Sequence, residues 1–355
     1  MIQVLILAGG SGTRFWPLSR RRRAKQFLAI VGREPLLRLT AQRVLPLCGW
    51  QGLWVVTGAD QADQVRRILP ELPRQHILAE PRARNTAAAI ALGAAAAGKR
   101  DPEGVLAVLP SDHVIRPVGR FRSLLRAAAN AARDGGIITF GVQPTRAETG
   151  YGYIQAGAPL QSTSAGPVLR VRRFTEKPDR ARAERFLRQG GYYWNSGMFV
   201  FGLATLRREL ARHLPPLALF LDRLVRLPRR RWAKEIGRTY SRLPSVSIDY
   251  GVMEKSSAVR MLSCDCAWSD VGSFSALTEL GPTDGAGNWQ RGQVLALDCR
   301  GCVLRSERRL LACVGLEDIV AVETPDAVLV CSRARAQEVG RLVRELARTG
   351  RRRLL

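Results

Sequence analysis

The chain of 355 residues is poor in several residue types, and each shortage removes a class of protein. It has only 3 histidines, 4 methionines and 5 lysines, and 6% of its residues are aromatic. No apolar run reaches the ~20 residues that a membrane span needs, since both Met1–Gly10 and the alanine-rich Thr86–Ala97 are shorter. Met1–Gly10 also lacks the basic start of a secretory signal. We therefore expect a cytoplasmic protein that does not enter a membrane.

Cysteine and histidine give little support to a metal cluster or a catalytic triad. The 7 cysteines are an odd number without the spacing of a disulfide framework, which is typical of reduced thiols. Cys299 and Cys302 have a spacing that zinc accepts, but Cys264 and Cys266 are too close together for the usual zinc knuckle. No histidine lies near either pair. We expect buried, reduced thiols.

Acidic residues are also scarce, because 30 Asp and Glu face 56 Lys and Arg, for a net charge of +26. Nearly all of the basic residues are arginines spread along the chain, which indicates a coding bias. A nucleic-acid-binding module should gather basic and aromatic residues in one segment, whereas the aromatic cluster Tyr192–Trp194 carries no such run. A basic nucleic-acid-binding protein stays an alternative, but a small anionic substrate suits the charge better.

Short apolar runs alternate with helical patterns over the first 280 residues, which predicts a doubly wound α/β domain with a mixed, mostly parallel sheet. The predicted strands are Ile2–Leu7, Leu53–Thr57, Val105–Leu109, Gly136–Val142 and Met198–Phe201. The predicted helices are Pro35–Leu45, Gln61–Leu69, Thr86–Ala97, Phe121–Ala132 and Ala181–Gln189.

The pattern changes after the Gly-, Pro- and Asp-rich stretch Gly281–Asn288. Short β-like runs follow at intervals of roughly 8–10 residues, and an amphipathic helix, Ala334–Arg348, comes last. The runs are Val294–Leu297, Val303–Arg305, Leu310–Val314, Ile319–Glu323 and Ala327–Cys331. We expect a catalytic domain over residues 1–285 and a small C-terminal β domain over 286–355, with a short β-helix as one candidate arrangement.

The loop Leu7–Arg14 follows the first strand, and its glycines let backbone N–H groups converge on an anion. It does not end in the Gly-Lys-Ser/Thr of a Walker A loop, and Phe15 replaces the third glycine of a dinucleotide fingerprint. A nicotinamide dehydrogenase is thereby disfavoured. The glycines alone fit a tight turn equally well, but Arg14 and Lys25 favour a phosphate-binding loop.

A run of further motifs follows this loop in order. The N-terminal motif is Leu7–Ser19, continued by Lys25–Leu28, and the others are Glu80–Pro81 with Arg84–Ala87, Pro110–His113, Gly150–Ile154, Phe174–Pro178, Trp194–Phe199, Ser247–Lys255 and Trp268–Gly272. Together they resemble the sugar-nucleotide pyrophosphorylases, and specifically the mannose-1-phosphate guanylyltransferases. The chain departs from the family at Ala24, Ala83 and Ala88, positions that affect loop stiffness rather than functional groups.

The resemblance implies a reaction of GTP with α-D-mannose 1-phosphate that yields GDP-mannose and pyrophosphate. It assigns Mg²⁺ to Asp112 and Asp270, which suits a hard cation that prefers carboxylates and substrate phosphates. It assigns catalysis to Arg14, Lys25 and Lys177. The implied nucleotide-binding residues are Gly9, Gly10, Gly12, Thr13, Arg14, Lys25, Glu80, Asn85, Thr86 and Ser111. The implied sugar-phosphate-binding residues are Gly152, Glu176, Lys177, Asn195 and Asp249.

The sequence leaves the substrate pair open. A pyrophosphorylase for another substrate pair, such as glucose 1-phosphate with UTP or dTTP, is the alternative within the same class. The chain around Glu176 and Lys177 is expected to be extended, with the two side chains on opposite faces. The expected partners are GTP and mannose 1-phosphate, without nucleic acid or membrane, and with a homo-oligomer as a candidate assembly.

Overall fold

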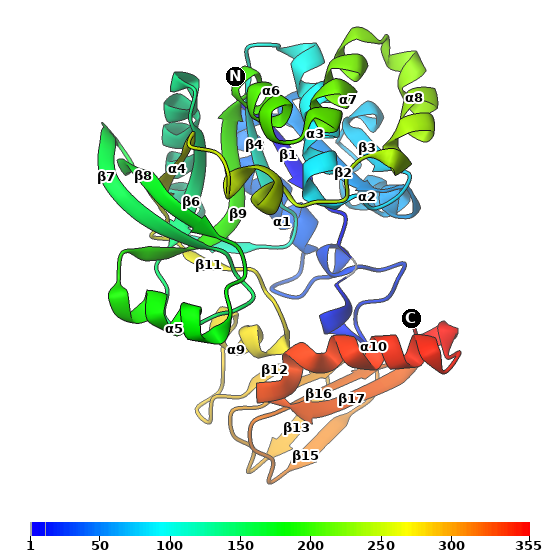
Figure 1. Cartoon of the computed structure of the whole chain (residues 1–355). Coiled ribbons are helices and arrows are strands. Elements are labelled where there is room, and N and C mark those ends of the chain that lie inside the picture. Colours follow the sequence, from blue (N-terminus) through cyan, green and yellow to red (C-terminus); the bar gives the residue numbers. More distant parts are fainter. Residues whose placement is uncertain (1, 11) are drawn as a thin grey trace. The chain divides into compact units, whose positions relative to one another are not determined.

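A computed structural model describes residues 2–10 and 12–355, which form two compact units (Figure 1). Unit 1 takes in the described residues of Met1–Gly9, Thr40–Ser111 and Ile115–Trp268. Unit 2 takes in those of Gly10–Leu39, Asp112–Val114 and Ser269–Leu355. The chain therefore enters unit 2 twice before the C-terminal segment. The expected domain boundary at residues 285 and 286 stays a prediction.

Unit 1 is built on a nine-stranded sheet with the order β3-β2-β1-β4-β9-β6-β10-β8-β7. Strands β8 and β9 run opposite to the other seven, so the sheet is mixed and mostly parallel, as predicted. The strands are β1 (Ile2–Leu7), β2 (Leu53–Gly58), β3 (Ile77–Glu80), β4 (Val105–Pro110), β6 (Ile137–Val142), β7 (Tyr153–Thr163), β8 (Gly166–Thr175), β9 (Tyr192–Gly202) and β10 (Val259–Ser263). The short strands β5 (Val114–Arg116) and β11 (Ala267–Ser269) lie outside this sheet.

The helices of the first 280 residues are α1 (Leu36–Cys48), α2 (Ala62–Ile68), α3 (Asn85–Arg100), α4 (Val118–Ala131), α5 (Arg180–Gln189), α6 (Leu203–His213), α7 (Pro215–Arg226), α8 (Trp232–Thr239) and α9 (Leu277–Leu280). The alanine-rich α3 is buried from Ala87 to Gly98. A Cβ atom at Gly93 would lie within 3 Å of the Leu5 side chain. Small residues thus let α3 approach β1 closely, which explains why this helix is alanine-rich.

Three expectations about single elements were wrong or incomplete. The run Met198–Phe201 belongs to a longer strand, β9, which is antiparallel to β4 and β6. The hairpin of β7 and β8 and the helices α6 to α8 were not predicted. The C-terminal helix begins as a 3₁₀ segment over Arg333–Glu338 and becomes α-helical only in α10 (Val339–Arg348).

The C-terminal part of unit 2 has the parallel pairing of a short β-helix. Strands β12 (Trp289–Arg291), β14 (Val303–Ser306) and β16 (Ile319–Thr324) pair in parallel, and β17 (Ala327–Ser332) is antiparallel to β16. Strands β13 (Val294–Leu297) and β15 (Leu311–Val314) form a second parallel pair. Val303 stands opposite Val320, and Val294 opposite Leu311, so each coil returns to the same position. The predicted small β domain is confirmed.

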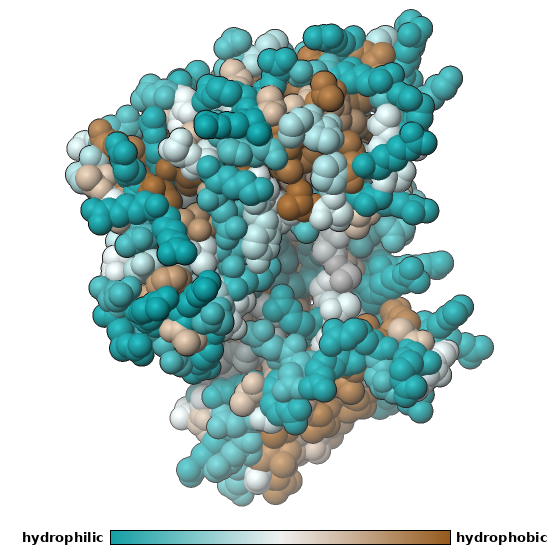
Figure 2. Space-filling model, viewed as in Figure 1, coloured by the Kyte–Doolittle hydropathy of each residue, from teal (hydrophilic) through white to brown (hydrophobic). Residues whose placement is uncertain are grey.

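Side chains of this β-helix divide between a buried interior and an exposed apolar strip. Cys299, Cys302 and Cys313 pack in the interior with Leu304 and Ala321. All 7 cysteines are free, and all but Cys331 are buried, as predicted. The exposed strip consists of Leu295, Leu297, Leu310, Val314, Val328 and Val330. Figure 2 shows apolar side chains over these strands, whereas the rest of the visible face is mostly hydrophilic. No helix among the described residues is long and apolar enough to cross a membrane.

Candidate active site

Lys25 is the centre of a buried polar cluster in unit 2. Its side chain is 8% exposed, and its Nζ lies 2.7 Å from Oδ2 of Asp112. The same Nζ donates to the backbone oxygens of Asp270 at 2.6 Å and Val271 at 3.0 Å. Burial acts to raise the pKa of Asp112, but the charges of Lys25 and His113 outweigh it and hold that pKa below its ordinary value. Asp112 is therefore a carboxylate at neutral pH.

Asp112 and Asp270 are the two carboxylates that the sequence predicted for a metal ion, and both belong to the cluster around Lys25. A Cβ atom at Gly272 would lie 3.1 Å from both carboxylate oxygens of Asp270, so glycine avoids a tight contact with this partly exposed residue. Among residues 2–10 and 12–355, no group of three or more His, Cys, Asp or Glu side chains could hold a metal. Two carboxylates with phosphate oxygens are a donor set that Mg²⁺ accepts, because it retains waters and binds few protein ligands.

The glycine-rich loop packs against the segment that carries Lys25. Gly12 has φ +62°, and a Cβ atom there would overlap the backbone of Lys25. Ser19 Oγ donates to the Gly12 oxygen at 2.7 Å, and Gln26 Nε2 donates to the Gly10 oxygen at 3.0 Å. Residues Thr13–Phe15 form a 3₁₀ turn that leaves Arg14 exposed. Ser11, in the middle of the predicted loop, lies outside the described residues.

Glu80 ends strand β3 in unit 1 and is 6% exposed. Tyr240 donates its hydroxyl to Oε1 of Glu80 at 2.6 Å, while a Cβ atom at Gly9 would lie 3.4 Å from Oε2. Burial raises the pKa of Glu80, and the hydrogen bond from Tyr240 opposes this shift. The structure thus brings together Gly9 and Glu80 and adds Tyr240, a residue for which the sequence carried no signal.

Asn85 and Thr86 begin helix α3 beyond strand β3. Asn85 has φ +61°, and its Oδ1 accepts from the Thr86 backbone N–H at 2.8 Å. Thr86 Oγ1 accepts from the Ile248 N–H at 2.9 Å, which ties this helix start to the motif Ser247–Lys255. Ser111 is buried, and its backbone is engaged by Leu7 and Thr40. Only the exposed Asn85 and the partly exposed Thr86 remain accessible in this group.

A second polar cluster in unit 1 gathers residues from five distant segments. Asn195 Nδ2 donates to Oδ1 of Asp249 at 3.0 Å, and Asn195 Oδ1 accepts from Thr139 Oγ1 at 3.1 Å. A Cβ atom at Gly152 would lie 2.5 Å from Oε2 of Glu176, so only glycine leaves room for that carboxylate. Oε2 is buried and has no hydrogen-bond partner within the described chain. It is an acceptor without a donor.

Burial raises the pKa of two acidic groups in this cluster, Glu176 and Asp249. Burial raises the pKa of Glu176, and the charge of Asp249 adds to the shift. Burial also raises the pKa of Asp249, against the hydrogen bond from Asn195. Lys177 Nζ lies 3.2 Å from Glu176 Oε1, with its side chain 57% exposed. The expectation of opposite faces was wrong, because Lys177 has φ +45° and the chain is not extended there.

Sequence reasoning missed three side chains that orient these groups. Thr139 orients Asn195, Tyr240 orients Glu80, and Glu254 accepts the Glu176 backbone N–H at 2.8 Å. Glu254 lies in the motif Ser247–Lys255, so the sequence pointed to this residue but not to its hydrogen bond with the Glu176 backbone. Thr139 was visible only as part of a predicted strand.

The model of the family described as Nucleotidyl transferase matches residues 3–286, and that of the MannoseP isomerase/GMP-like beta-helix domain matches residues 292–346. The chain belongs to the nucleotidyl transferase family, and it is an enzyme. It is 42% identical to the xanthan biosynthesis protein XanB of Xanthomonas campestris pv. campestris (strain B100), over 98% of this chain and 73% of that protein. It is 37% identical to the mannose-1-phosphate guanylyltransferase of Escherichia coli, over 99% of this chain and 75% of that protein.

A solved structure extends the similarity to the fold. The crystal structure described as mannose-1-phosphate geranyltransferase from Thermus thermophilus has a TM-score of 0.87 and 36% identity, over 98% of this chain and 99% of that one. The resemblance to the mannose-1-phosphate guanylyltransferases is thus confirmed over nearly the whole chain.

Proposed function

We propose that this enzyme converts GTP and α-D-mannose 1-phosphate into GDP-mannose and pyrophosphate. An oxygen of the sugar phosphate forms a bond to the α-phosphorus of GTP, and the bond from that phosphorus to the bridging oxygen breaks. The electron pair leaves with pyrophosphate. The sugar phosphate is largely dianionic at neutral pH, so no protein base is needed to activate it. The observation that carries the proposal is the buried, unpaired Glu176 oxygen beside Asn195 and Lys177.

The sugar phosphate is assigned to the cluster around Glu176. The free Oε2 accepts a hydrogen bond from a sugar hydroxyl, which relieves the cost of a buried acceptor without a donor. Asn195 and Asp249, with Gly152 beside them, complete the polar surface for further hydroxyls. Lys177 is exposed and carries a mobile positive charge for the phosphate.

The triphosphate is assigned to the glycine-rich loop and Lys25. Gly10, Gly12 and Thr13 offer backbone N–H groups, and Arg14 adds an exposed guanidinium. Arg14 and Lys25 stabilise the charge that grows on the departing pyrophosphate. Glu80, Asn85 and Thr86 are assigned to the guanine base, because a carboxylate accepts from its adjacent N–H donors.

Asp112 and Asp270 would hold Mg²⁺, which when bound neutralises phosphate charge. The ionised state of Asp112 and the partial exposure of Asp270 support this assignment. Lys25 also positions the two aspartates. It forms an ion pair with Asp112 and donates to the backbone oxygens of Asp270 and Val271, which fixes the aspartates relative to one another.

A screen for pyrophosphate release tests the proposal. Each nucleoside triphosphate is paired with each hexose 1-phosphate, and GTP with mannose 1-phosphate is expected to give the highest kcat/KM. A tenfold preference for UTP or dTTP, or for glucose 1-phosphate, would replace the proposal by the alternative pyrophosphorylase.

The proposal extends to the assembly and location of the enzyme. The apolar strip Leu295, Leu297, Leu310, Val314, Val328 and Val330 supports a homo-oligomer, because surfaces of this kind are commonly covered. Sedimentation of the wild type and of Val314→Glu would test it, with a shift to monomer expected in the variant. A cytoplasmic location would place the enzyme with its charged substrates, which do not cross a bilayer unaided.

A further inference from the structure

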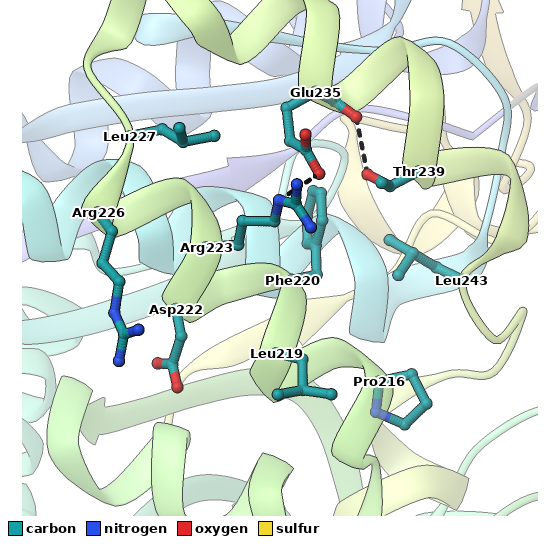
Figure 3. A pocket seen from close by; sticks show the side chains of 10 residues that line it. All are labelled: Pro216, Leu219, Phe220, Asp222, Arg223, Arg226, Leu227, Glu235, Thr239 and Leu243. Carbon is teal, nitrogen blue, oxygen red and sulfur yellow. Dashed lines mark hydrogen bonds and ion pairs between the residues drawn. The ribbon is translucent and has the colours of Figure 1, made fainter.

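Helices α7 and α8 of unit 1 border an open cavity that the proposed reaction does not use. Its volume is about 520 Å³, within the range of sites for small organic ligands. Figure 3 shows apolar side chains around the opening, and Leu219, Phe220, Leu227 and Leu243 form its apolar lining. Leu219 is 70% exposed.

The charged residues around the cavity leave one cation without a partner. Arg223 Nε lies 2.8 Å from Oε1 of Glu235, and Arg238 also pairs with that carboxylate at 3.1 Å. Asp222, at the cavity edge, is paired with Arg207 at 2.5 Å. Arg226 lines the cavity and has no ion pair with any residue that the structure describes. Every carboxylate at this site is therefore neutralised, and Arg226 supplies a surplus positive charge.

We infer that this cavity binds a small amphipathic anion, with an apolar ring or short hydrocarbon body and one carboxylate, sulfonate or phosphate group. The apolar body covers Leu219, Phe220 and Leu243, and the anionic group pairs with Arg226. The apolar body supplies most of the affinity and the ion pair with Arg226 adds a smaller part, because an exposed ion pair contributes little.

The cavity is linked through Phe220 and Tyr240 to Glu80, a residue assigned to the nucleotide, and this extension rests on the proposed function. Phe220 packs edge-on against Tyr240, with ring centroids 5.6 Å apart and an interplanar angle of 72°. Tyr240 in turn donates to Glu80. A ligand that contacts Phe220 therefore shifts a ring whose neighbour orients the carboxylate proposed for guanine, and the cavity acts as an effector site.

Fluorescence titration with 1-anilinonaphthalene-8-sulfonate, an aromatic sulfonate, tests binding without any activity. Saturable binding by the folded enzyme is expected. Arg226→Ala should weaken it about fivefold, as for loss of an exposed ion pair. Leu219→Glu should weaken it further, because it removes apolar surface and adds a repelling charge. Arg230→Ala is the matched control, since it removes an exposed arginine that does not line the cavity.

Two further probes separate the apolar and ionic parts. The neutral dye N-phenyl-1-naphthylamine should bind the wild type and Arg226→Ala alike, and inorganic phosphate alone should not displace the sulfonate. Binding of the sulfonate that is unchanged in both Arg226→Ala and Leu219→Glu would place the dye elsewhere and overturn the inference. Both substitutions are at exposed positions, and unchanged circular dichroism would exclude unfolding as the cause.

The link to the nucleotide is read from steady-state kinetics. Saturating sulfonate should change the apparent KM for GTP in the wild type, leave the KM for mannose 1-phosphate unchanged, and have no effect on Leu219→Glu. A KM for GTP that does not respond in the wild type would overturn the effector role. The titration is independent of the reaction, so failure of the proposed function would be seen separately in the substrate screen.

Discussion

Buried polar atoms without partners identify the residues that a substrate must satisfy. Glu176 Oε2 is such an atom, whereas Asn195 and Asp249 are already hydrogen-bonded to one another. A buried acceptor without a donor costs roughly 1–3 kcal/mol, and ligand binding recovers that cost. If the sugar binds here as proposed, we expect Glu176 to contribute more to its affinity than these two neighbours do.

Lys177 and Arg14 are expected to affect different kinetic constants. Lys177→Ala should raise the KM for mannose 1-phosphate, because the sugar phosphate is charged in both ground and transition states. Loss of a charge-assisted contact of about 1.5–3 kcal/mol corresponds to roughly a 10- to 100-fold change. Arg14→Ala should chiefly lower kcat, because it faces charge that grows on the leaving group.

Kinetics with each substrate varied in turn measures both effects, and Lys234→Ala, an exposed lysine on α8, serves as the control. A Lys177→Ala enzyme impaired only in its response to GTP would reverse the assignment of the two phosphates.

Asp270→Asn should retain the fold and lose most of its turnover, because an amide is nearly isosteric but is a poor ligand for a hard cation. Chelator should abolish the activity of the wild type, and excess Mg²⁺ should restore it. Thermal melts of both proteins provide the structural control. Wild-type turnover that persists in chelator would show that the two aspartates do not hold a metal.

The raised pKa of Glu80 predicts a pH-dependent effect on stability. Glu80 retains its proton to higher pH in the folded protein than in the unfolded chain. Its contribution to stability therefore falls as pH rises from about 4.3, the ordinary glutamate pKa, to its raised folded value. Glu80→Gln mimics the protonated acid and should stabilise the protein more at pH 7 than at pH 4. Denaturant unfolding of both proteins at the two pH values measures the difference, and an equal effect at both would contradict the shift.

Residue motifs gave the candidate site but not the groups that orient it. Gly152, Glu176 and Asn195 were predicted from short motifs, and the fold brings them together. Tyr240 could not be predicted, because a tyrosine at the end of a helix has no local signature and meets Glu80 only through the tertiary fold. Thr139 is likewise an ordinary strand residue until Asn195 packs beside it.

Among the secondary-structure elements, single glycines determine how closely neighbouring segments approach. Gly93 lets α3 pack on β1, and Gly152, just before β7, leaves room for Glu176 after β8 and for Asn195 in β9. At Gly152, the atom nearest to an added Cβ belongs to the Glu176 carboxylate rather than to the backbone. A side chain added there displaces a functional group and leaves the sheet intact.

Gly152→Ala should therefore raise the KM for mannose 1-phosphate about tenfold or more while the melting temperature stays close to that of the wild type. The added Cβ would lie 2.5 Å from Glu176 Oε2, so the carboxylate must move. Gly119→Ala in α4 is the matched control, because no atom lies within 4 Å of its added Cβ. A Gly152→Ala enzyme with an unchanged KM would exclude Glu176 from sugar binding.

Helices and strands were predicted correctly where a local sequence pattern alone determines the secondary structure. The buried run of β1 and the alanine-rich face of α3 are visible in sequence because burial on all sides leaves a continuous apolar segment. The direction of β9 was not visible, because a buried strand reads the same whether its neighbours are parallel or antiparallel. The first turn of the C-terminal helix has a helical pattern, which 3₁₀ and α conformations share.

At the scale of the whole molecule, the net charge of +26 is expected to attract the two anionic substrates that we propose. We predict that kcat/KM for GTP falls as sodium chloride is raised from about 0.01 to 0.5 M, since the screening length shortens from about 30 Å to below 10 Å. Rates at matched ionic strength in different salts provide the control for specific ion effects. A kcat/KM that stays flat would mean that the arginine excess has no part in substrate capture.

The position of β9 within the sheet of unit 1 has a consequence for biosynthesis. This strand fills the place between β4 and β6, yet it is made after both, and β10 follows still later. Until residue 202 has left the ribosome, β4 and β6 lack the neighbour that pairs with both. Long-range pairing of this kind is slow and leaves strand edges open to aggregation. A nascent chain stalled before β9 should therefore be held by chaperones, and one released after β10 should fold without them.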